Sequence, residues 1–168
     1  MKIAILGHSG SGKSTLARAL GDKYGLPVLH FDAIHFLPGW VETDRPYKRE
    51  KVTEFLDANP EGWVIDGNYL KICAQRRFEE ADHILYLDFP RRLCLPRVLK
   101  RWLQYRGKTR PDMAPGCDEK VDREFLLWVL RDGRAPEKLA EFEAVKQQYP
   151  HKFHHYKSPK QLEKELFL

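Results

Sequence analysis

The stretch Gly7-His8-Ser9-Gly10-Ser11-Gly12-Lys13-Ser14 decides the fold of this chain. It fits the pattern G-x-x-x-x-G-K-[ST], with a predicted strand over residues 2–7 before it and an amphipathic helix over residues 13–24 after it. Glycines allow backbone N–H groups to turn inward around a phosphate, and the helix N-terminus attracts the same anion. The stretch therefore predicts a loop that binds the phosphates of a nucleoside triphosphate. The residues expected to bind it are Gly7, Gly10, Ser11, Gly12, Lys13, Ser14 and Thr15.

Two of these side chains carry expected chemistry. Lys13 is expected to reach the β and γ phosphates of ATP and to act in catalysis, and Ser14 is expected to ligate Mg²⁺. His8 occupies a variable position of the pattern, where the backbone contacts the phosphate, and we assign it no chemistry.

Strand and helix patterns alternate along the rest of the chain. Short strands separated by helices indicate βαβ units around a parallel sheet, so the sequence predicts an α/β, three-layer fold with a five-stranded sheet. A length of 168 residues suits one domain, over residues 1–168. The predicted strands are 2–7, 27–31, 63–65, 83–87 and 152–156, and the predicted helices are 13–24, 46–58, 91–106, 119–132, 136–148 and 159–167.

Composition narrows the classes of partner. No apolar run approaches the roughly 20 residues needed to cross a bilayer, so no membrane partner is expected. Three widely spaced cysteines, Cys73, Cys94 and Cys117, argue against a disulfide framework or a structural zinc site and favour the reducing cytoplasm. The net charge of +5 suits an anionic partner, and both nucleotide phosphates and DNA meet that condition.

Three aspartates follow predicted strands. In open α/β sheets the ligand binds outside the carboxyl ends of the strands, where Asp32, Asp66 and Asp88 fall. Asp66 follows an apolar run and is predicted to hold Mg²⁺ together with Ser14. Asp32 is predicted to orient the hydroxyl or phosphate of an acceptor. A helix cap or a turn is the alternative role for each, above all for Asp88.

Cations gather in the helix predicted over 91–106 and in the segment after it. Residues 106–116 carry two prolines, two glycines and three cations, which predicts an exposed, mobile lid of about 106–118. Arg97 and Arg101 share the face opposite the apolar residues of the helix. A solvated basic face is the alternative, but the position of the helix favours catalytic arginines that clamp the triphosphate.

Four more arginines belong to this group. Arg106 and Arg110 are expected to bind the nucleotide from the lid. Arg131 and Arg134 return toward the site from the far side of the lid, and Arg131 is expected to be catalytic.

Four segments together resemble a known family. Residues 7–14, 30–38, 63–69 and 105–113 resemble the FlaR-type DNA topology modulation proteins, which are adenylate-kinase-related P-loop proteins. This resemblance covers nearly the whole chain. It implies the fold of nucleoside monophosphate kinases, with parallel strand order 2-3-1-4-5.

The likeness to adenylate kinases themselves is more local. Leu87-Asp88-Phe89-Pro90, with Arg97 and Arg101 following, is similar to the stretch leading into that family's lid. The resemblance implies that Arg97 covers the donor adenine and that Arg101 contacts phosphates.

The acceptor side departs from adenylate kinases. Asp66-Gly67 matches the start of their Asp-Gly-Phe-Pro-Arg motif, but Asn68-Tyr69-Leu70 replaces the rest. The arginine that would grip the AMP phosphate is therefore missing. We expect AMP to be a poor acceptor, and a neutral molecule whose hydroxyl donates to Asp32 to be a better one. The alternative is that Lys71 and Arg45 fold inward and replace the missing cation.

Three functions remain open at this point. The leading hypothesis is ATP- and Mg²⁺-dependent phosphoryl transfer to a small acceptor, either a nucleotide, a nucleoside or another hydroxyl metabolite. The second is a DNA-binding protein that affects topology, although the sequence contains no helix-turn-helix, zinc finger or dense basic tail. The third is a regulatory NTPase without a small acceptor.

Overall fold

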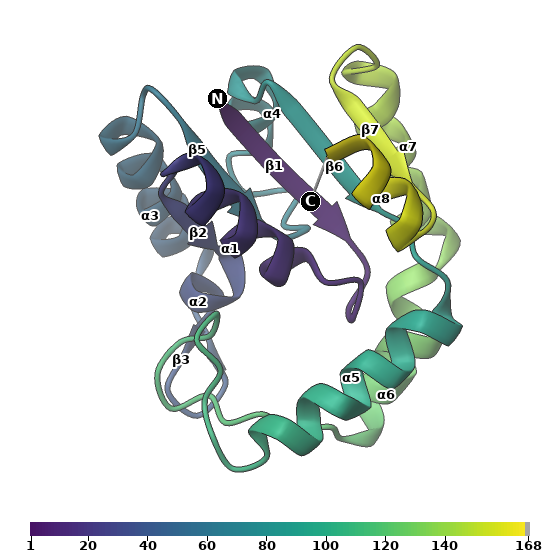
Figure 1. Cartoon of the computed structure of the whole chain (residues 1–168). Coiled ribbons are helices and arrows are strands. Elements are labelled where there is room, and N and C mark those ends of the chain that lie inside the picture. The colour runs from purple at the N-terminus through teal and green to yellow at the C-terminus, as the bar shows by residue number, and fades with distance from the viewer. Residues whose placement is uncertain (167–168) are drawn as a thin grey trace.

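Five parallel strands form the centre of the molecule (Figure 1). The computed structural model describes residues 1–166. The sheet order is β2-β5-β1-β6-β7, which is 2-3-1-4-5 when its five strands are numbered along the chain, and this confirms the predicted order. The strands are β1 (Lys2–Gly7), β2 (Val28–His30), β5 (Trp63–Asp66), β6 (His83–Leu87) and β7 (Phe153–Tyr156).

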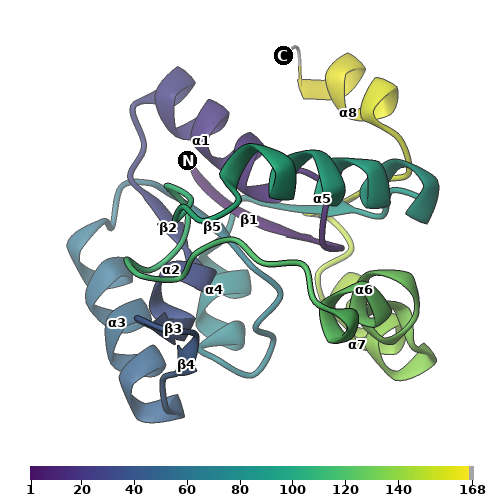
Figure 2. The ribbon, with the colours of Figure 1, turned by 90° about the horizontal axis from the view of Figure 1, so that it is seen from below.

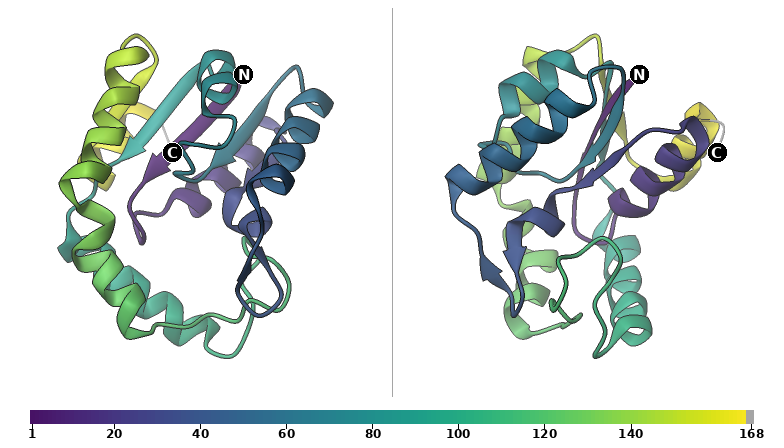
Figure 3. Two further views of the ribbon diagram at one scale, coloured as in Figure 1. Left: turned by 180° about the vertical axis from the view of Figure 1, so that it is seen from behind. Right: turned by 90° about the vertical axis from the view of Figure 1, so that its left-hand side faces the viewer.

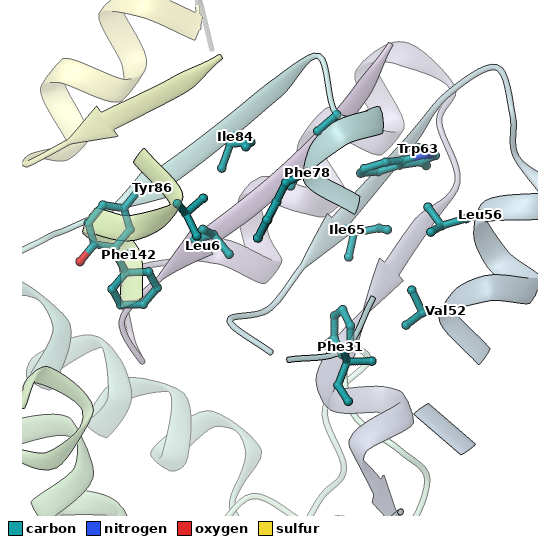
Figure 4. Packing of buried hydrophobic residues seen from close by; sticks show 14 residues of the cluster. Leu6, Phe31, Val52, Leu56, Trp63, Ile65, Phe78, Ile84, Tyr86 and Phe142 are labelled. Atoms are coloured by element: carbon teal, nitrogen blue, oxygen red, sulfur yellow. The ribbon is translucent and has the colours of Figure 1, made fainter. Parts of the chain in front are cut away.

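Helices cover both faces of this sheet (Figures 2 and 3). Because side chains alternate along a strand, Ile3 and Ile5 of β1 pack on one face, and Ala4 and Leu6 pack on the other. Figure 4 shows Leu6 in the second of these clusters, with Phe78 beside it. The first face carries α1 (Lys13–Tyr24) and α8 (Pro159–Leu166), and the second carries α3 (Arg45–Ala58), α4 (Ala74–Glu80) and α7 (Pro136–Gln148).

Short elements after β2 shape one side of the molecule. They are α2 (Phe31–His35) and an antiparallel hairpin of β3 (Phe36–Leu37) and β4 (Val41–Glu42). The strand predicted over 27–31 ends at His30, since the buried Phe31 begins α2. Asp32 therefore lies in the first turn of a helix and does not close the strand.

Two helices form an arm that leaves the sheet and curves back toward β3 (Figure 1). They are α5 (Arg91–Tyr105) and α6 (Arg123–Leu130), and the short 3-10 helix η1 (Asp132–Arg134) follows. The helix predicted over 119–132 is shorter than expected, because Asp122 caps α6 by accepting a hydrogen bond from the Phe125 N–H at 2.8 Å. The predicted end of the last helix, Phe167, lies outside the described residues.

The segment 106–118 is more buried than the sequence predicted. Met113, Ala114 and Cys117 pack against Phe36 and Trp40 of the β3–β4 hairpin. The expected exposure therefore holds for part of the segment, such as residues 106–108, whereas residues 112–114 are buried. Met113 and Ala114 are covered because the hairpin supplies an apolar partner that sequence spacing did not reveal. Mobility of the segment stays a prediction. None of the described helices has the length and apolar character needed to span a membrane.

Candidate active site

The glycine loop joins β1 to α1 and depends on backbone conformations that glycine favours. Gly10 and Gly12 have φ angles of +78° and +96°. A Cβ atom on Gly10 would lie 2.4 Å from the carbonyl oxygen of Cys94 on α5, so a side chain there would displace the loop. The loop and the start of α1 border an open cavity of about 1540 Å³.

Lys13 lies folded over this loop. Its Nζ donates hydrogen bonds to the carbonyl oxygens of Gly7 at 2.9 Å and His8 at 3.2 Å. Burial lowers the pKa of Lys13, and the negative charges of Asp66 and Asp32 oppose that shift. Lys13 is therefore held against backbone oxygens within reach of two carboxylates.

Ser14 and Asp66 form the pair that the sequence predicted. The Ser14 hydroxyl donates to Asp66 Oδ2 at 2.8 Å, and Asp66 Oδ1 lies 2.6 Å from Nδ1 of His30. Burial disfavours charge on His30, but the hydrogen bond and charge of Asp66 outweigh it and raise the pKa of His30. A serine hydroxyl beside a carboxylate is an oxygen donor set of the kind Mg²⁺ prefers, so these residues fit the ion.

Asn68 closes the gap between the glycine loop and β5. Its Oδ1 accepts from the Gly7 N–H at 2.9 Å, and its Nδ2 donates to the Gly7 carbonyl at 2.9 Å. In the sequence, Asn68 stands out only as a departure from adenylate kinases. Its position directly after Asp66-Gly67 at a strand end was the available signal.

Across the cavity, Asp32 is held by Tyr69. The Tyr69 hydroxyl donates to Asp32 Oδ1 at 2.8 Å, and its ring stacks on Phe31 with centroids 4.7 Å apart. Burial and the charge of Asp32 both raise the pKa of Tyr69, so the phenol stays protonated and keeps donating. Within residues 1–166, Tyr69 is the one side chain that donates to Asp32, which leaves capacity to accept from a ligand.

Three of the predicted arginines line the cavity. The Nη1 of Arg97 donates to the carbonyl oxygen of Ser11 in the glycine loop at 3.1 Å. Arg101 and Arg110 share the buried carboxylate of Glu119, through Nε–oxygen distances of 2.8 Å and 2.6 Å. Arg97 thus contacts the loop directly, whereas the other two guanidinium groups are already paired.

The segment 106–118 also reaches the glycine loop. Arg110 pairs with Asp112 at 2.9 Å. Burial disfavours the charged form of Asp112, but the charge of Arg110 outweighs it and holds the pKa of Asp112 below the usual range. Asp112 borders the same cavity as Ser14 and Asp66, and it is a site residue that was not identified from the sequence.

Arg106 and Arg131 lie apart from the other predicted site residues. Arg106 stacks over the Trp102 ring at 5.2 Å, and neither arginine borders the cavity. Arg131 has a side chain that is 76% exposed and pairs with its neighbour Asp132 at 2.7 Å. The structure does not bring these two arginines to the glycine loop.

Asp88 contacts the glycine loop through His8. It lies 3.1 Å from Nε2 of His8 and 3.0 Å from Nε2 of His155, and Arg134 is 3.6 Å away. His8 also contacts the hydroxyl of Tyr86 at 3.2 Å. Asp88 therefore ties the loop to β6 and β7, which is closer to its alternative structural role than to ligand binding.

Comparisons with known proteins give the fold a context. No family model matches the chain. Over 116 residues it is 26% identical to a protein of Methanocaldococcus jannaschii named "Putative adenylate kinase". The match covers 64% of this chain and 59% of that relative, so the chain spans less than two thirds of the relative's length.

Solved structures are similar over almost the whole chain. One is deoxyadenosine kinase from M. mycoides with bound dATP, with a TM-score of 0.55, 16% identity, and coverage of 99% of this chain and 97% of that one. Another is shikimate kinase from Acinetobacter baumannii in complex with shikimate, with a TM-score of 0.58, 18% identity, and coverage of 99% and 90%. These likenesses show that the chain has the P-loop α/β fold found in small-molecule kinases.

Proposed function

We propose that this protein is an ATP-dependent kinase that transfers the γ-phosphate to a small acceptor. One observation carries the proposal. The glycine loop, with Lys13 and the Ser14–Asp66 pair, borders the same cavity as the Asp32–Tyr69 pair. A site for a triphosphate and a carboxylate suited to an attacking hydroxyl therefore face one space.

The proposed transfer assigns a role to each side. The acceptor oxygen forms a bond to the γ phosphorus, the bond from that phosphorus to the bridging oxygen breaks, and ADP leaves. Asp32 accepts the hydroxyl proton, which then passes to solvent, and Tyr69 holds the carboxylate in place.

The cations act on the donor side. Lys13 stabilises charge on the β and γ phosphates, and Arg97 contacts the nucleotide beside the glycine loop. Arg101 adds positive charge from α5, and Arg110 adds it from the segment 106–118, which we propose acts as a lid. Ser14 and Asp66 would hold Mg²⁺, which supplies positive charge to the phosphate oxygens when bound.

The names of the similar proteins support this reading at the level of reaction class. The named acceptors differ, since one neighbour is a deoxyadenosine kinase and another a shikimate kinase. They therefore favour transfer to a small acceptor without identifying it. Free thiols at Cys73, Cys94 and Cys117 support the expected cytoplasmic location.

The FlaR-type resemblance keeps DNA as the second candidate, but the pairing of the arginines on α5 and the lid weighs against it. Arg101 and Arg110 are paired with the buried Glu119, so they do not form an exposed basic surface. The organised pair of Asp32 and Tyr69 weighs against an NTPase without an acceptor, because water needs no such pocket.

The test is ATP consumption with Mg²⁺ over nucleoside monophosphates, nucleosides and hydroxyl metabolites, with water alone and duplex DNA as separate arms. We expect one small-molecule class to raise turnover at least about tenfold above water. Equal rates in every arm would favour the NTPase without an acceptor. Stimulation by DNA alone would favour the second candidate.

A further inference from the structure

A buried lysine on the acceptor side has no partner. Lys48 of α3 is 6% exposed and borders the cavity together with Asp32 and Tyr69. Within residues 1–166, its Nζ makes no ion pair and no hydrogen bond. Most of the Lys48 side chain is covered, but its Nζ stays accessible from the cavity and has no counterion there among the described residues. Lysines are rarely this buried unless they are paired. The position therefore calls for an anion that this chain does not supply.

The other lysine of α3, Lys51, is not buried in this way. Lys48 lies on the same face as Val52 and Leu56, the other buried residues of α3, at spacings of one helical turn. Lys51 of the same helix is more exposed and pairs with Glu54 at 2.7 Å. The buried face of α3, formed by Lys48, Val52 and Leu56, thus places the cation Lys48 at the cavity.

A second polar group on the acceptor side of the cavity also lacks a hydrogen-bond partner in the described part of the chain. The Nδ1 of His35 is buried without a hydrogen bond, while its Nε2 lies 3.6 Å from Glu42. Burial lowers the pKa of His35, and the nearby charge of Lys48 lowers it further, against the opposing charges of Glu42 and Asp32. The Lys48 ammonium and the His35 imidazole therefore lie on the same side of the cavity. The lowered pKa keeps the imidazole of His35 neutral beside the positive charge of Lys48.

We infer that Lys48 binds an anionic group of the acceptor, which is then a hydroxyl-bearing carboxylate or phosphate monoester. Its hydroxyl would meet Asp32 and its anionic oxygens would meet Lys48. Arg45 and Lys71 border the same cavity and add positive charge. The inference rests on the proposed kinase function and deepens it. It also reverses the expectation of a neutral acceptor, which rested on the missing arginine after Asp66 and did not include Lys48.

The first test measures anion binding directly and needs no turnover. The donor site is saturated with Mg²⁺ and a non-hydrolysable ATP analogue, so that added anions cannot bind at the glycine loop. Inorganic phosphate or acetate is then titrated at constant ionic strength against chloride, and the thermal midpoint is followed, because a ligand of the folded state raises it. The proteins are wild type, Lys48→Met and the matched control Lys51→Met.

We expect phosphate or acetate to raise the midpoint of wild type and Lys51→Met, with at least about tenfold weaker apparent affinity in Lys48→Met. The anion with the larger effect distinguishes a phosphate-bearing acceptor from a carboxylate. No midpoint shift in wild type beyond the chloride control, or an equal shift in Lys48→Met, would overturn the inference.

The stability of the variant without added anion is an independent readout. Lys48→Met should have a thermal midpoint no lower than that of wild type, because methionine of similar length keeps the packing of the buried stem and removes a charge that has no partner within residues 1–166. A lower midpoint would mean that Lys48 has a structural role, and the inference would fail. Lys48-dependent anion binding together with no acceptor-dependent ATP consumption would instead remove the proposed kinase function and leave the anion site in place.

Discussion

The polar groups on the two sides of the cavity differ in how many partners the protein gives them. On the donor side the protein itself engages them, since Lys13 bonds to loop carbonyls and Ser14 bonds to Asp66. On the acceptor side Lys48 and the Nδ1 of His35 have no partner within residues 1–166. Apart from the buried Ser11 hydroxyl, which also lacks a partner among these residues, the donor side is thus held by its own contacts. The acceptor side combines the paired Asp32 and Tyr69 with groups that a ligand would complete. The predictions below test this difference.

Replacing Lys13 should have the largest effect. Lys13→Ala removes the cation from the glycine loop, and we expect turnover to fall at least about a hundredfold, the scale for one lost electrostatic stabiliser. Initial rates of ADP formation measure this change. The thermal midpoint should change little, since the loop keeps its glycines. Near-normal turnover in a folded variant would remove the phosphotransferase proposal.

Replacing Asp32 tests the acceptor side. Asp32→Asn keeps the shape but cannot take the hydroxyl proton, so transfer should slow about a hundredfold while ATP affinity stays nearly unchanged. Tyr69→Phe removes only the hydrogen bond that holds Asp32 and should have a smaller effect. Rates at saturating ATP and equilibrium binding of an ATP analogue separate the two quantities. A loss of ATP affinity in Asp32→Asn would place Asp32 on the donor side instead.

Replacing Arg97 and replacing Arg131, both predicted from the sequence to be catalytic, should have different effects on turnover. Arg97→Ala should lower turnover about tenfold, because it removes a guanidinium that contacts the glycine loop. Arg131→Ala should stay within about twofold of wild type, as expected for an exposed ion pair. Steady-state rates for both variants decide the point. A strong loss in Arg131→Ala would show that the arm brings Arg131 inward during turnover.

The smallest effects should appear in the pH dependence of stability, with opposite signs on the two sides. The raised pKa of His30 means that its charged pair with Asp66 is fully present below about pH 6.5 and is lost as pH rises through the raised value. The lowered pKa of His35 means that protonation of the unfolded chain below about pH 6.5 destabilises the folded protein.

Thermal midpoints of His30→Gln and His35→Gln, compared with wild type, test both signs. The first substitution should cost more stability at about pH 5.5 than at about pH 8.5, and the second should cost less at the lower pH. The same trend in both variants would show that the two histidines do not have opposite environments.

The donor side could be predicted from the sequence because its pattern is local, and its binding roles stay a prediction. Eight consecutive residues define the glycine loop, and Asp66 directly follows its strand. Lys48 could not be identified in this way, since its burial depends on how α3 packs on the sheet. The burial of part of the segment 106–118 could not be predicted for a related reason: Glu119 pairs with Arg110, and the β3–β4 hairpin covers Met113, Ala114 and Cys117, only in the folded chain.

The hairpin and the segment 106–118 are joined by hydrogen bonds between residues far apart in sequence. The Gly39 N–H donates to the Gly116 carbonyl at 3.0 Å, and the Trp40 indole N–H donates to the Asp118 carbonyl at 3.0 Å. Neither segment separates from the other without breaking these bonds. In amide hydrogen exchange, the Gly39 N–H therefore reports the opening of both segments, and one exchange rate gives the free energy of opening the cavity rim.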